Sequence, residues 1–107
     1  MSSVFEDIAG LDKLIHEPAR LAIMTILSTI ESADFLALQR LTGLTSGNLS
    51  VHLSKLAEGE LISYNKQFVG KKPKTEIKIS LKGQQALDKH WSQLENFRSD
   101  VQKTKST

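Results

Sequence analysis

Small polar side chains gather at the start of a helix that we predict over residues 46–58. The spacing of Leu49, Leu53 and Leu56 turns these leucines toward one side, because each residue advances a helix by about 100°. The opposite side and the preceding capping position carry Thr45, Ser46, Gly47, Asn48, Ser50, Val51, Ser54 and Lys55. Amide and hydroxyl groups can pair with base edges, and an aliphatic group can contact a thymine methyl. These residue types favour a DNA-reading helix over a merely solvated helix face.

A cluster of lysines follows this helix. Residues 1–60 contain four Lys/Arg against eight Asp/Glu, whereas residues 61–82 contain six lysines against Glu76 alone. The cations and one hydroxyl at or beside a predicted turn over residues 70–74 are Lys66, Lys71, Lys72, Lys74 and Thr75. A protruding basic ribbon can bind phosphates and release counterions. Alternatively, such lysines protect an exposed strand from aggregation. We favour phosphate contact because the polar helix lies next to the ribbon in the chain.

Other chemistry has few candidates. The chain has three histidines and no cysteine, which excludes disulfides and thiolate metal sites. His52 adjoins the leucine face of its helix, so we expect a packed, hydrogen-bonded side chain rather than a metal ligand. We interpret Trp91 as an anchor in a helix interface. Phosphate loops, nucleophile elbows and zinc motifs are missing, so we predict no metal, no cofactor and no enzymatic activity.

The elements that must position these residues follow from hydrophobic periodicity. Apolar residues at helical spacing predict helices over residues 3–15, 18–31, 34–42, 46–58 and 81–102. Residues 61–69 form a predicted strand, and Thr75–Ser80 alternates in the manner of a half-buried strand. Pro18 suits the first turn of the second helix, and Phe35, Leu38 and Leu41 give the third helix its apolar face. The predicted fold is mainly α with a small β-hairpin, an α+β arrangement.

Two of these helices form a predicted helix-turn-helix over residues 34–58. Ser32–Asp34 offers capping side chains for the shorter helix, and Gly43 ends it. A turn of a few residues then leads to a cap at Thr45 or Ser46. Two helices joined by such a glycine-containing turn are the signature of this DNA-binding motif.

The stretch from His16 to Trp91 resembles a winged-helix DNA-binding family related to the MarR and ArsR regulators. The resemblance rests on residues 16–21 (His-Glu-Pro-Ala-Arg-Leu), 47–56 (Gly-Asn-Leu-Ser-Val-His-Leu-Ser-Lys-Leu), 68–75 (Phe-Val-Gly-Lys-Lys-Pro-Lys-Thr) and 80–83 (Ser-Leu-Lys-Gly). It implies a winged helix-turn-helix fold and a dimeric repressor or activator whose Asn48, Ser50, Val51 and Ser54 face DNA. Similar proteins usually have Gly directly before the Leu-Ile that starts the wing, whereas this chain has Glu60.

The resemblance also implies that the first and last helices form a dimer contact, and the apolar stripes favour the same reading. The candidate dimer residues are Val4, Ile8, Leu11, Leu87, Trp91, Leu94, Phe97 and Val101. Left uncovered, these stripes would expose more apolar surface than a soluble monomer usually shows. The alternative is that both helices pack on their own domain. We predict a single winged-helix domain over residues 1–107, with dimerisation helices at 1–15 and 84–102 and a wing at 61–80.

The functional hypothesis is a cytoplasmic, homodimeric transcriptional regulator that binds double-stranded DNA at specific sequences. A winged-helix module that binds another protein is the alternative. No apolar run approaches the roughly 20 residues that span a bilayer, so we expect no membrane partner. The acidic N-terminal segment does not resemble a secretory signal. No residue commits the chain to a small-molecule effector.

Overall fold

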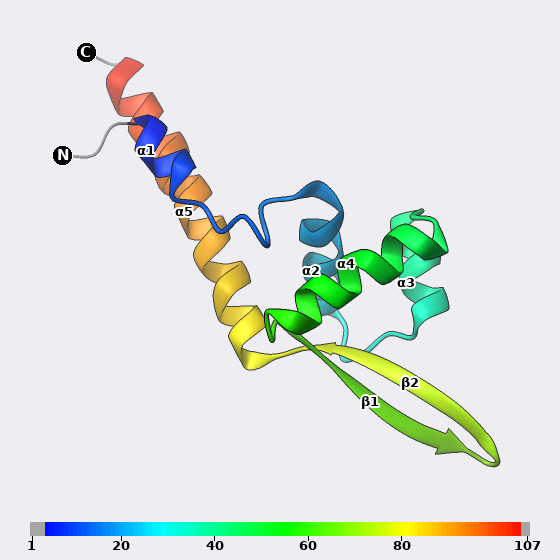
Figure 1. The fold of residues 1–107 in the computed structure, drawn as a ribbon. Coiled ribbons are helices and arrows are strands. Elements are labelled where there is room, and N and C mark those ends of the chain that lie inside the picture. Colours follow the sequence, from blue (N-terminus) through cyan, green and yellow to red (C-terminus); the bar gives the residue numbers. More distant parts are fainter. Residues whose placement is uncertain (1–3, 106–107) are drawn as a thin grey trace.

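Residues 4–105 are described by the computed structural model, and they form five helices and one β-hairpin. In chain order the elements are α1 (Val4–Ala9), α2 (Pro18–Thr29), α3 (Phe35–Thr42), α4 (Ser46–Glu58), β1 (Ile62–Val69), β2 (Lys72–Ile79) and α5 (Leu81–Lys105). Helices α2–α4 cluster at the base of the hairpin, while α5 runs out of this body with α1 beside its outer half (Figure 1). The predicted fold class, a mainly helical winged helix-turn-helix with a two-stranded hairpin, is confirmed.

Side-chain caps fix where the three central helices begin. Glu17 accepts a hydrogen bond from the Arg20 N–H (2.8 Å) at the start of α2, and Asp34 accepts one from the N–H of Ala37 (2.7 Å) at the start of α3. Gly43 ends α3 with a φ of 73°, a left-handed conformation that suits glycine. Helix α4 spans the predicted residues 46–58, whereas α2 ends two residues earlier than predicted.

Helix α1 is much shorter than the predicted helix over residues 3–15. It ends at Ala9, and the chain continues through turns to Pro18. The carboxylate of Asp12 accepts a hydrogen bond from the N–H of Leu14 (2.9 Å), a local contact that competes with helical hydrogen bonding. Gly10 adds a weak helix former at the same place. Leu11 and Ile15 are nevertheless buried, so the apolar pattern predicted burial correctly but the wrong backbone conformation.

The hairpin has a tighter turn than expected. The predicted turn covered residues 70–74, but Val69 pairs with Lys72, which leaves only Gly70 and Lys71 in the loop. Gly70 has a φ of 67°, which a two-residue loop of this kind requires and glycine readily adopts. Pro73 therefore lies within β2, opposite Phe68. A two-stranded ribbon tolerates this proline because it leaves alternate N–H groups unpaired.

The core joins the helices to the base of the hairpin. It consists of Ile15, Ile23, Met24, Leu27, Ala33, Leu38, Leu49, Leu53, Leu56, Leu61, Ile62, Ile77 and Leu87. Ala33, just before α3, exchanges two backbone hydrogen bonds with Ile77 of β2 (3.0 and 2.7 Å), so the hairpin is tied to the helix-turn-helix. Leu41 is 61% exposed, so its predicted place on the buried face of α3 is wrong. That face is completed instead by Ala37, half-buried against the core.

The connection from α4 to β1 contains a strained residue. Glu60 has a φ of 63°, and it stands where similar proteins usually have glycine. Its carbonyl accepts a hydrogen bond from the hydroxyl of Ser80 (2.6 Å), and the same hydroxyl accepts one from the N–H of Gly83 (2.9 Å) at the start of α5. The glutamate therefore adopts the left-handed conformation that a glycine would take. The Ser80 hydroxyl ties this α4–β1 turn to the start of α5.

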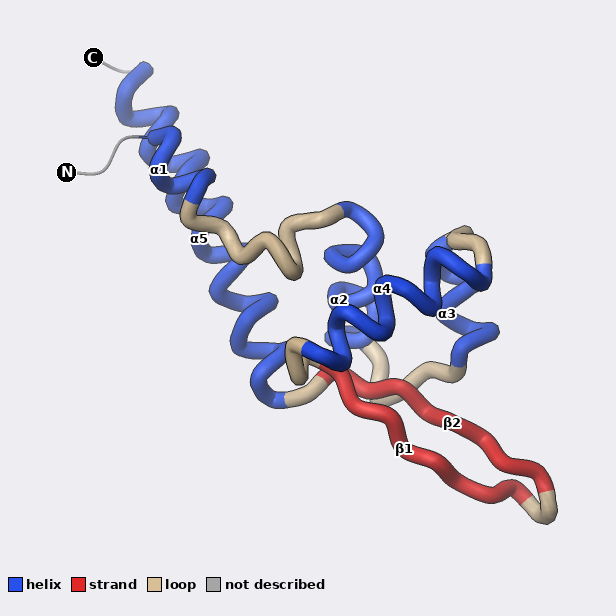
Figure 2. Tube along the Cα trace, in the orientation of Figure 1, coloured by secondary structure: helices blue, strands red, loops and turns tan. Residues whose placement is uncertain are grey.

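The described chain is elongated. Its radius of gyration is 16.7 Å and its extents are 65 × 26 × 21 Å, whereas a compact domain of this length has a radius of about 13 Å. The elongation comes from α1 and the outer half of α5, which project from the body opposite to the hairpin (Figure 2). None of the helices within the described range has the length and apolar character needed to cross a bilayer.

Candidate nucleic-acid interface

The outer surface of α4 is small, polar and open. Leu49, Leu53 and Leu56 point into the core. The other predicted contact residues of this helix and its cap are all exposed: Thr45, Ser46, Gly47, Asn48, Ser50, Val51, Ser54 and Lys55. The Thr45 hydroxyl accepts a hydrogen bond from the N–H of Asn48 (3.2 Å), which orders the first turn. The helix thus presents the predicted residues together on one accessible side.

Gly47 lacks an internal reason to be glycine. A Cβ atom built at this position meets no other atom within 4 Å, and its φ is not positive. A glycine inside a helix costs about 1 kcal/mol relative to alanine. The protomer's own packing therefore does not require glycine here, and the first turn of α4 presents its backbone without a side chain at this position.

A buried arginine holds α4 against α2. Arg20 donates hydrogen bonds to the carbonyl of Leu14 (2.6 Å) and to Nδ1 of His52 on α4 (3.1 Å). Only 9% of its surface is exposed, and Glu17 lies 3.9 Å from its guanidinium. Because the guanidinium has only donors, Nδ1 of His52 is the acceptor and carries no proton. The expectation that His52 is packed and hydrogen-bonded is confirmed.

Glu17 completes this network. Burial acts to raise the pKa of Glu17, but hydrogen bonds from the backbone N–H groups of Arg20 and Ala19 and the charge of Arg20 act the other way, so its pKa lies below the usual value. The sequence analysis missed Arg20. The available signal was its position three and four residues before Ile23 and Met24, which places a charged side chain on the buried side of α2.

The strand register divides the wing, defined here as β1, β2 and the Gly70–Lys71 loop, into two faces. Cross-strand partners share a face and successive residues alternate. The inner face, which continues from the core, carries the pairs Ile62–Ile79, Tyr64–Ile77, Lys66–Thr75 and Phe68–Pro73. The outer face carries the pairs Ser63–Lys78, Asn65–Glu76, Gln67–Lys74 and Val69–Lys72. The candidate cations are therefore distributed: Lys66 lies on the inner face, Lys72 and Lys74 lie on the outer face, and Lys71 lies in the loop.

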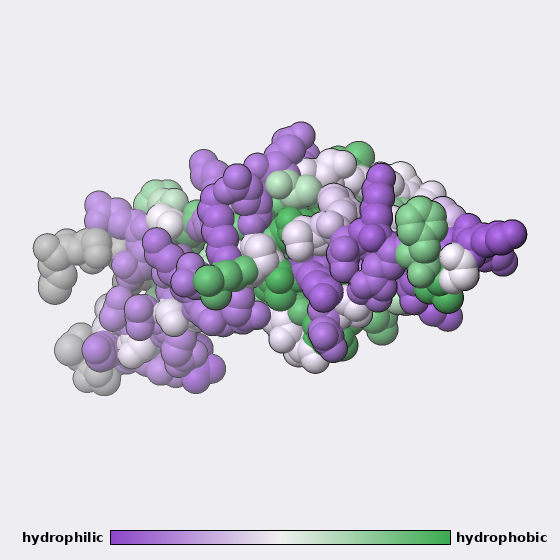
Figure 3. All heavy atoms as spheres, turned by 90° about the horizontal axis from the view of Figure 1, so that it is seen from below, coloured by the Kyte–Doolittle hydropathy of each residue, from purple (hydrophilic) through white to green (hydrophobic). Residues whose placement is uncertain are grey.

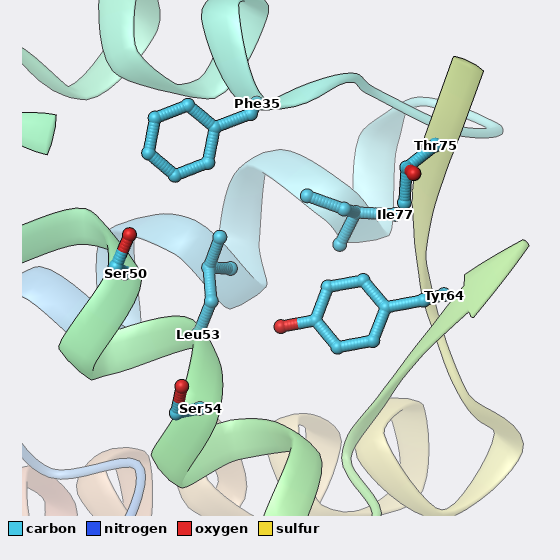
Figure 4. Close-up of a pocket in the computed structure, with 7 residues that line it drawn as sticks. All are labelled: Phe35, Ser50, Leu53, Ser54, Tyr64, Thr75 and Ile77. Carbon is cyan, nitrogen blue, oxygen red and sulfur yellow. The ribbon is translucent and has the colours of Figure 1, made fainter. Parts of the chain in front are cut away.

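The inner face of the wing meets α4 at a pocket of about 260 Å³. Its walls are Phe35, Ser50, Leu53, Ser54, Tyr64, Thr75 and Ile77 (Figure 4). The phenol ring of Tyr64 reaches from β1 toward α4, on the side where Ser54 lies. Burial raises the pKa of the Tyr64 hydroxyl, so this group remains a hydrogen-bond donor. Three predicted contact residues, Ser50, Ser54 and Thr75, thus lie around one hollow, and the sequence analysis missed Phe35 and Tyr64.

The charges of the wing are available to a partner. Lys82, which follows the wing, pairs with Glu60 (3.3 Å), while Glu17 and Glu95 lie 3.9 and 3.7 Å from the guanidinium groups of Arg20 and Arg98. The wing lysines 66, 71, 72 and 74 are all exposed. Glu76 is the one acid between residues 61 and 82. The wing is therefore a cationic element with little internal neutralisation, which suits a polyanion.

The candidate dimer residues with described side chains fall into three groups by exposure. Leu11 and Leu87 are 5% and 2% exposed within the single chain, so their prediction as contact residues is corrected: they belong to the protomer's own interior. Ile8, Leu94 and Phe97 are half-buried where α1 lies along α5. Trp91 and Val101 remain 46% and 42% exposed. The side chain of Val4 lies outside the described residues.

His90 is buried on α5 beside this region. Both of its ring nitrogens lack a hydrogen-bond partner among the described residues, and its ring lies 5.2 Å from that of His16 and 5.9 Å from that of Trp91. Burial and the neighbouring His16 lower the pKa of His90, while Asp12 acts to raise it. Within residues 4–105 no three His, Asp or Glu side chains come together as a metal site.

Sequence comparison matches most of the chain to known proteins. The family described as "Winged helix DNA-binding domain" matches residues 19–98. An uncharacterized protein of Methanocaldococcus jannaschii is 35% identical over 75 residues, which cover 70% of this chain and 82% of that protein.

Solved structures of transcriptional regulators share the fold. A transcriptional regulator homologue of Pyrococcus horikoshii OT3 has a TM-score of 0.81 and 26% identity, covering 92% of this chain and 96% of its own. A regulator of the MarR family from Enterococcus faecalis V583 has a TM-score of 0.74 and 18% identity, covering 100% and 96%. The transcriptional repressor PagR of Bacillus anthracis has a TM-score of 0.60 and 25% identity, covering 78% and 92%. The predicted resemblance to winged-helix regulators is confirmed.

Proposed function

Because the chain belongs to the winged helix DNA-binding domain family, we propose that it is a transcriptional regulator that binds double-stranded DNA at specific sequences as a homodimer. The observation that carries the proposal is the pairing of an open, small-residue surface on α4 with a cationic wing beside it. The exposed side chains of α4 and the wing lysines lie outside the protomer's core, and together they match the two kinds of contact that DNA offers, base edges and phosphates.

In this proposal α4 lies in the major groove. Gly47 and the small side chains around it let the helix backbone approach the DNA closely. Asn48 pairs with an adenine edge, Ser50 and Ser54 donate to or accept from bases, and Val51, 52% exposed, contacts a thymine methyl. Thr45 and Ser46 lie at the helix N-terminus, where free N–H groups favour a phosphate. Lys55, one turn further along α4, extends toward the sugar–phosphate backbone of the DNA.

The wing supplies phosphate contacts beside the major groove. Lys66 and Thr75 form one cross-strand pair on the inner face, next to the hollow that α4 shares with the wing. Lys71 in the loop and Lys72 and Lys74 on the outer face surround the end of the ribbon. A ribbon with cations on both faces can approach phosphates of both DNA strands. These contacts provide affinity without sequence preference.

The second copy binds through α1 and α5 in this proposal. These helices project from the body, and Trp91 and Val101 remain partly uncovered on them. Ile8, Leu94 and Phe97 contribute their remaining exposed surface. Two-fold symmetry then places two α4 helices about one DNA turn apart, roughly 34–36 Å, and predicts a palindromic site.

Selection of bound sequences from a random duplex pool tests sequence-specific binding. We expect a palindromic sequence to be enriched by the parent chain. In Asn48→Ala we expect affinity for the selected duplex to fall about 10- to 100-fold and affinity for a random duplex to change little, because a bidentate base contact contributes about 1–3 kcal/mol of discrimination.

The matched control is Asn96→Ala, which removes an exposed asparagine from α5 and should keep the parent's discrimination. Binding is measured by fluorescence anisotropy at fixed salt. Equal losses on selected and random duplexes would contradict base reading by Asn48. A pool that shows no enrichment would contradict the proposal and favour the protein-interaction alternative.

A further inference from the structure

An uncovered aromatic side chain lies near the end of the wing. Phe68 is 75% exposed, and its neighbour Val69 is 64% exposed. The cross-strand partner of Phe68 is Pro73, also exposed, and only one further pair separates them from the loop. The core cluster does not include any of these three residues. Their apolar surface therefore contributes nothing to the stability of the described protomer.

The surroundings of this apolar pair are cationic. Lys66 is the next residue toward the core on the same face, Lys71 occupies the loop, and Lys72 and Lys74 lie on the opposite face. Seen from below, hydrophobic atoms at the wing end of the molecule lie among hydrophilic ones (Figure 3). A partner that covers Phe68 must therefore accept apolar contact and several positive charges together. Duplex DNA offers both, because stacked bases lie between two rows of phosphates.

The position of the Phe68–Pro73 pair fits the DNA groove next to the one that α4 occupies. Phe68 lies on the inner face of the wing, four residues beyond Tyr64, which lines the hollow shared with α4. Four strand residues span about 13 Å. Adjacent groove centres lie roughly 17 Å apart, half of a DNA turn of about 34 Å. With α4 in the major groove, the Phe68–Pro73 pair therefore reaches the adjacent minor groove.

We propose that Phe68, backed by Pro73, inserts between two adjacent base pairs from the minor groove and kinks the DNA at the flank of the site. This inference rests on the DNA binding proposed above. Apolar side chains of these types act as wedges that partly unstack a base step. The cost of unstacking is least at pyrimidine–purine steps, so the kinked step is TA or CA. The lysines around the pair hold the phosphates on either side of the opened step.

The test uses the full chain and the duplex recovered by selection, with 2-aminopurine placed at successive flanking positions. Its fluorescence rises when the base loses its stacking neighbours. We expect the parent chain to raise fluorescence at one flanking step on each side of the site. Phe68→Ala should abolish this rise and weaken binding about tenfold, since stacking on an aromatic ring contributes about that factor. Phe68→Leu should keep part of the rise, because leucine can also act as a wedge.

Gln67→Ala provides the matched control, because Gln67 is the exposed neighbour on the outer face and should leave both readouts unchanged. Phe68 makes no core contact, so its variants fold, and thermal unfolding verifies this. The wedge proposal would be overturned if the parent chain bound the duplex without raising fluorescence at any flank. It would also be overturned if Phe68→Ala kept the parent's affinity and fluorescence signal. Either result would favour a protein partner for the apolar end of the wing. A parent chain that binds no duplex would instead overturn the proposed function itself.

Discussion

His90 is a buried polar side chain without a hydrogen-bond partner among the described residues. Its side chain is fully buried, and neither ring nitrogen has a hydrogen-bond partner within residues 4–105. A protonated imidazole at this place would be a buried charge beside His16, with Asp12 as the compensating carboxylate. The native structure therefore disfavours the charged form of His90, and burial lowers its pKa below the ordinary value of 6.5.

We predict from this that acid weakens the fold through His90. Above about pH 7 both folded and unfolded chains hold this residue neutral. Below pH 6.5 the unfolded chain takes up the proton first, so the free energy of unfolding falls as the pH falls. Because the unfolded chain titrates near pH 6.5, one such group lowers the free energy of unfolding by at most about 1.4 kcal/mol between pH 7.5 and 5.5. Urea unfolding of the parent and of His90→Leu at both pH values, at one protein concentration, measures this difference.

In His90→Leu that part of the acid dependence should disappear, while Lys89→Leu, which changes the exposed neighbour on α5, should keep it. The same slope in the parent and in His90→Leu would show that other groups cause the acid sensitivity. Glu17, whose pKa is lowered, contributes stability that is lost only at more acidic pH. The two groups are therefore separable by the pH range in which each acts.

Glu60 offers a second prediction about a single residue. The left-handed backbone conformation destabilises the fold by about 1–2 kcal/mol for a residue with a side chain. The exposed Glu60–Lys82 ion pair (3.3 Å) offsets little of this destabilisation. We expect Glu60→Gly to raise the free energy of unfolding by about 0.5–1 kcal/mol after the entropy cost of glycine. Glu60→Ala loses the ion pair but keeps the strain, so chemical denaturation should show no gain. A destabilised Glu60→Gly would mean that the ion pair outweighs the backbone strain.

Among the elements, those with strong local signals were predictable. Helix α4 begins and ends at the predicted residues because Thr45 caps it and three leucines repeat at helical spacing. The wing's strands were predicted, but its turn was not, because Pro73 suggested a longer loop than the Gly70–Lys71 turn that forms. Helix α1 was predicted too long, because its apolar residues keep helical spacing through a segment that Gly10 and Asp12 divert into turns.

The candidate interface was predictable as a set of residues but not as a surface. The exposed side of α4 follows directly from periodicity. The pocket wall of Phe35 and Tyr64 does not, since it depends on how the hairpin packs on α3 and α4. The distribution of lysines over two faces of the wing depends on the strand register, which the two-residue loop determines. The burial of Arg20 could be predicted from its spacing to Ile23 and Met24, but its hydrogen bonds to the carbonyl of Leu14 and to His52 depend on how the helices pack.

The wing as an element carries the salt dependence of the proposed DNA binding. Lys71 and Lys72 are exposed neighbours at the tip, and each neutralised phosphate adds about 0.9 to the magnitude of the slope of log K against log salt. We expect Lys71→Ala/Lys72→Ala to lower that magnitude by about 2 and to weaken binding similarly on selected and random duplexes. Anisotropy titrations over a salt series measure the slope.

The matched control for the wing is Lys13→Ala/Lys89→Ala, which removes two exposed lysines outside the wing and α4. It changes the net charge by the same amount and should retain the parent's slope. If both double variants lost the same slope, net charge rather than the position of the wing would govern binding, and the wing would have no special role.

The elongated shape of the described chain supports the proposed dimer contact along α5. A radius of gyration of 16.7 Å exceeds the roughly 13 Å of a compact domain because α1 and the outer half of α5 leave the body. Within the described chain α1 packs along the outer half of α5, away from the domain core, whereas the first half of α5 lies against the body (Figure 1). A projecting helix pair with a half-exposed tryptophan is costly in a monomer and ordinary in a dimer, where a second pair covers it.

We therefore predict that Trp91→Glu converts a dimer into monomers. Trp91 is 46% exposed and lies where α5 leaves the body, so a charge there would be buried without a partner at the two-fold contact. The dimer dissociation constant should rise at least about 100-fold, as sedimentation velocity over a concentration series would measure. Leu81→Glu places the same charge at the 77% exposed start of α5 and should leave the dimer intact. A Trp91→Glu chain that still sediments as a dimer would exclude this part of α5 from the contact, and the two α4 helices would then need another symmetry to reach successive major grooves.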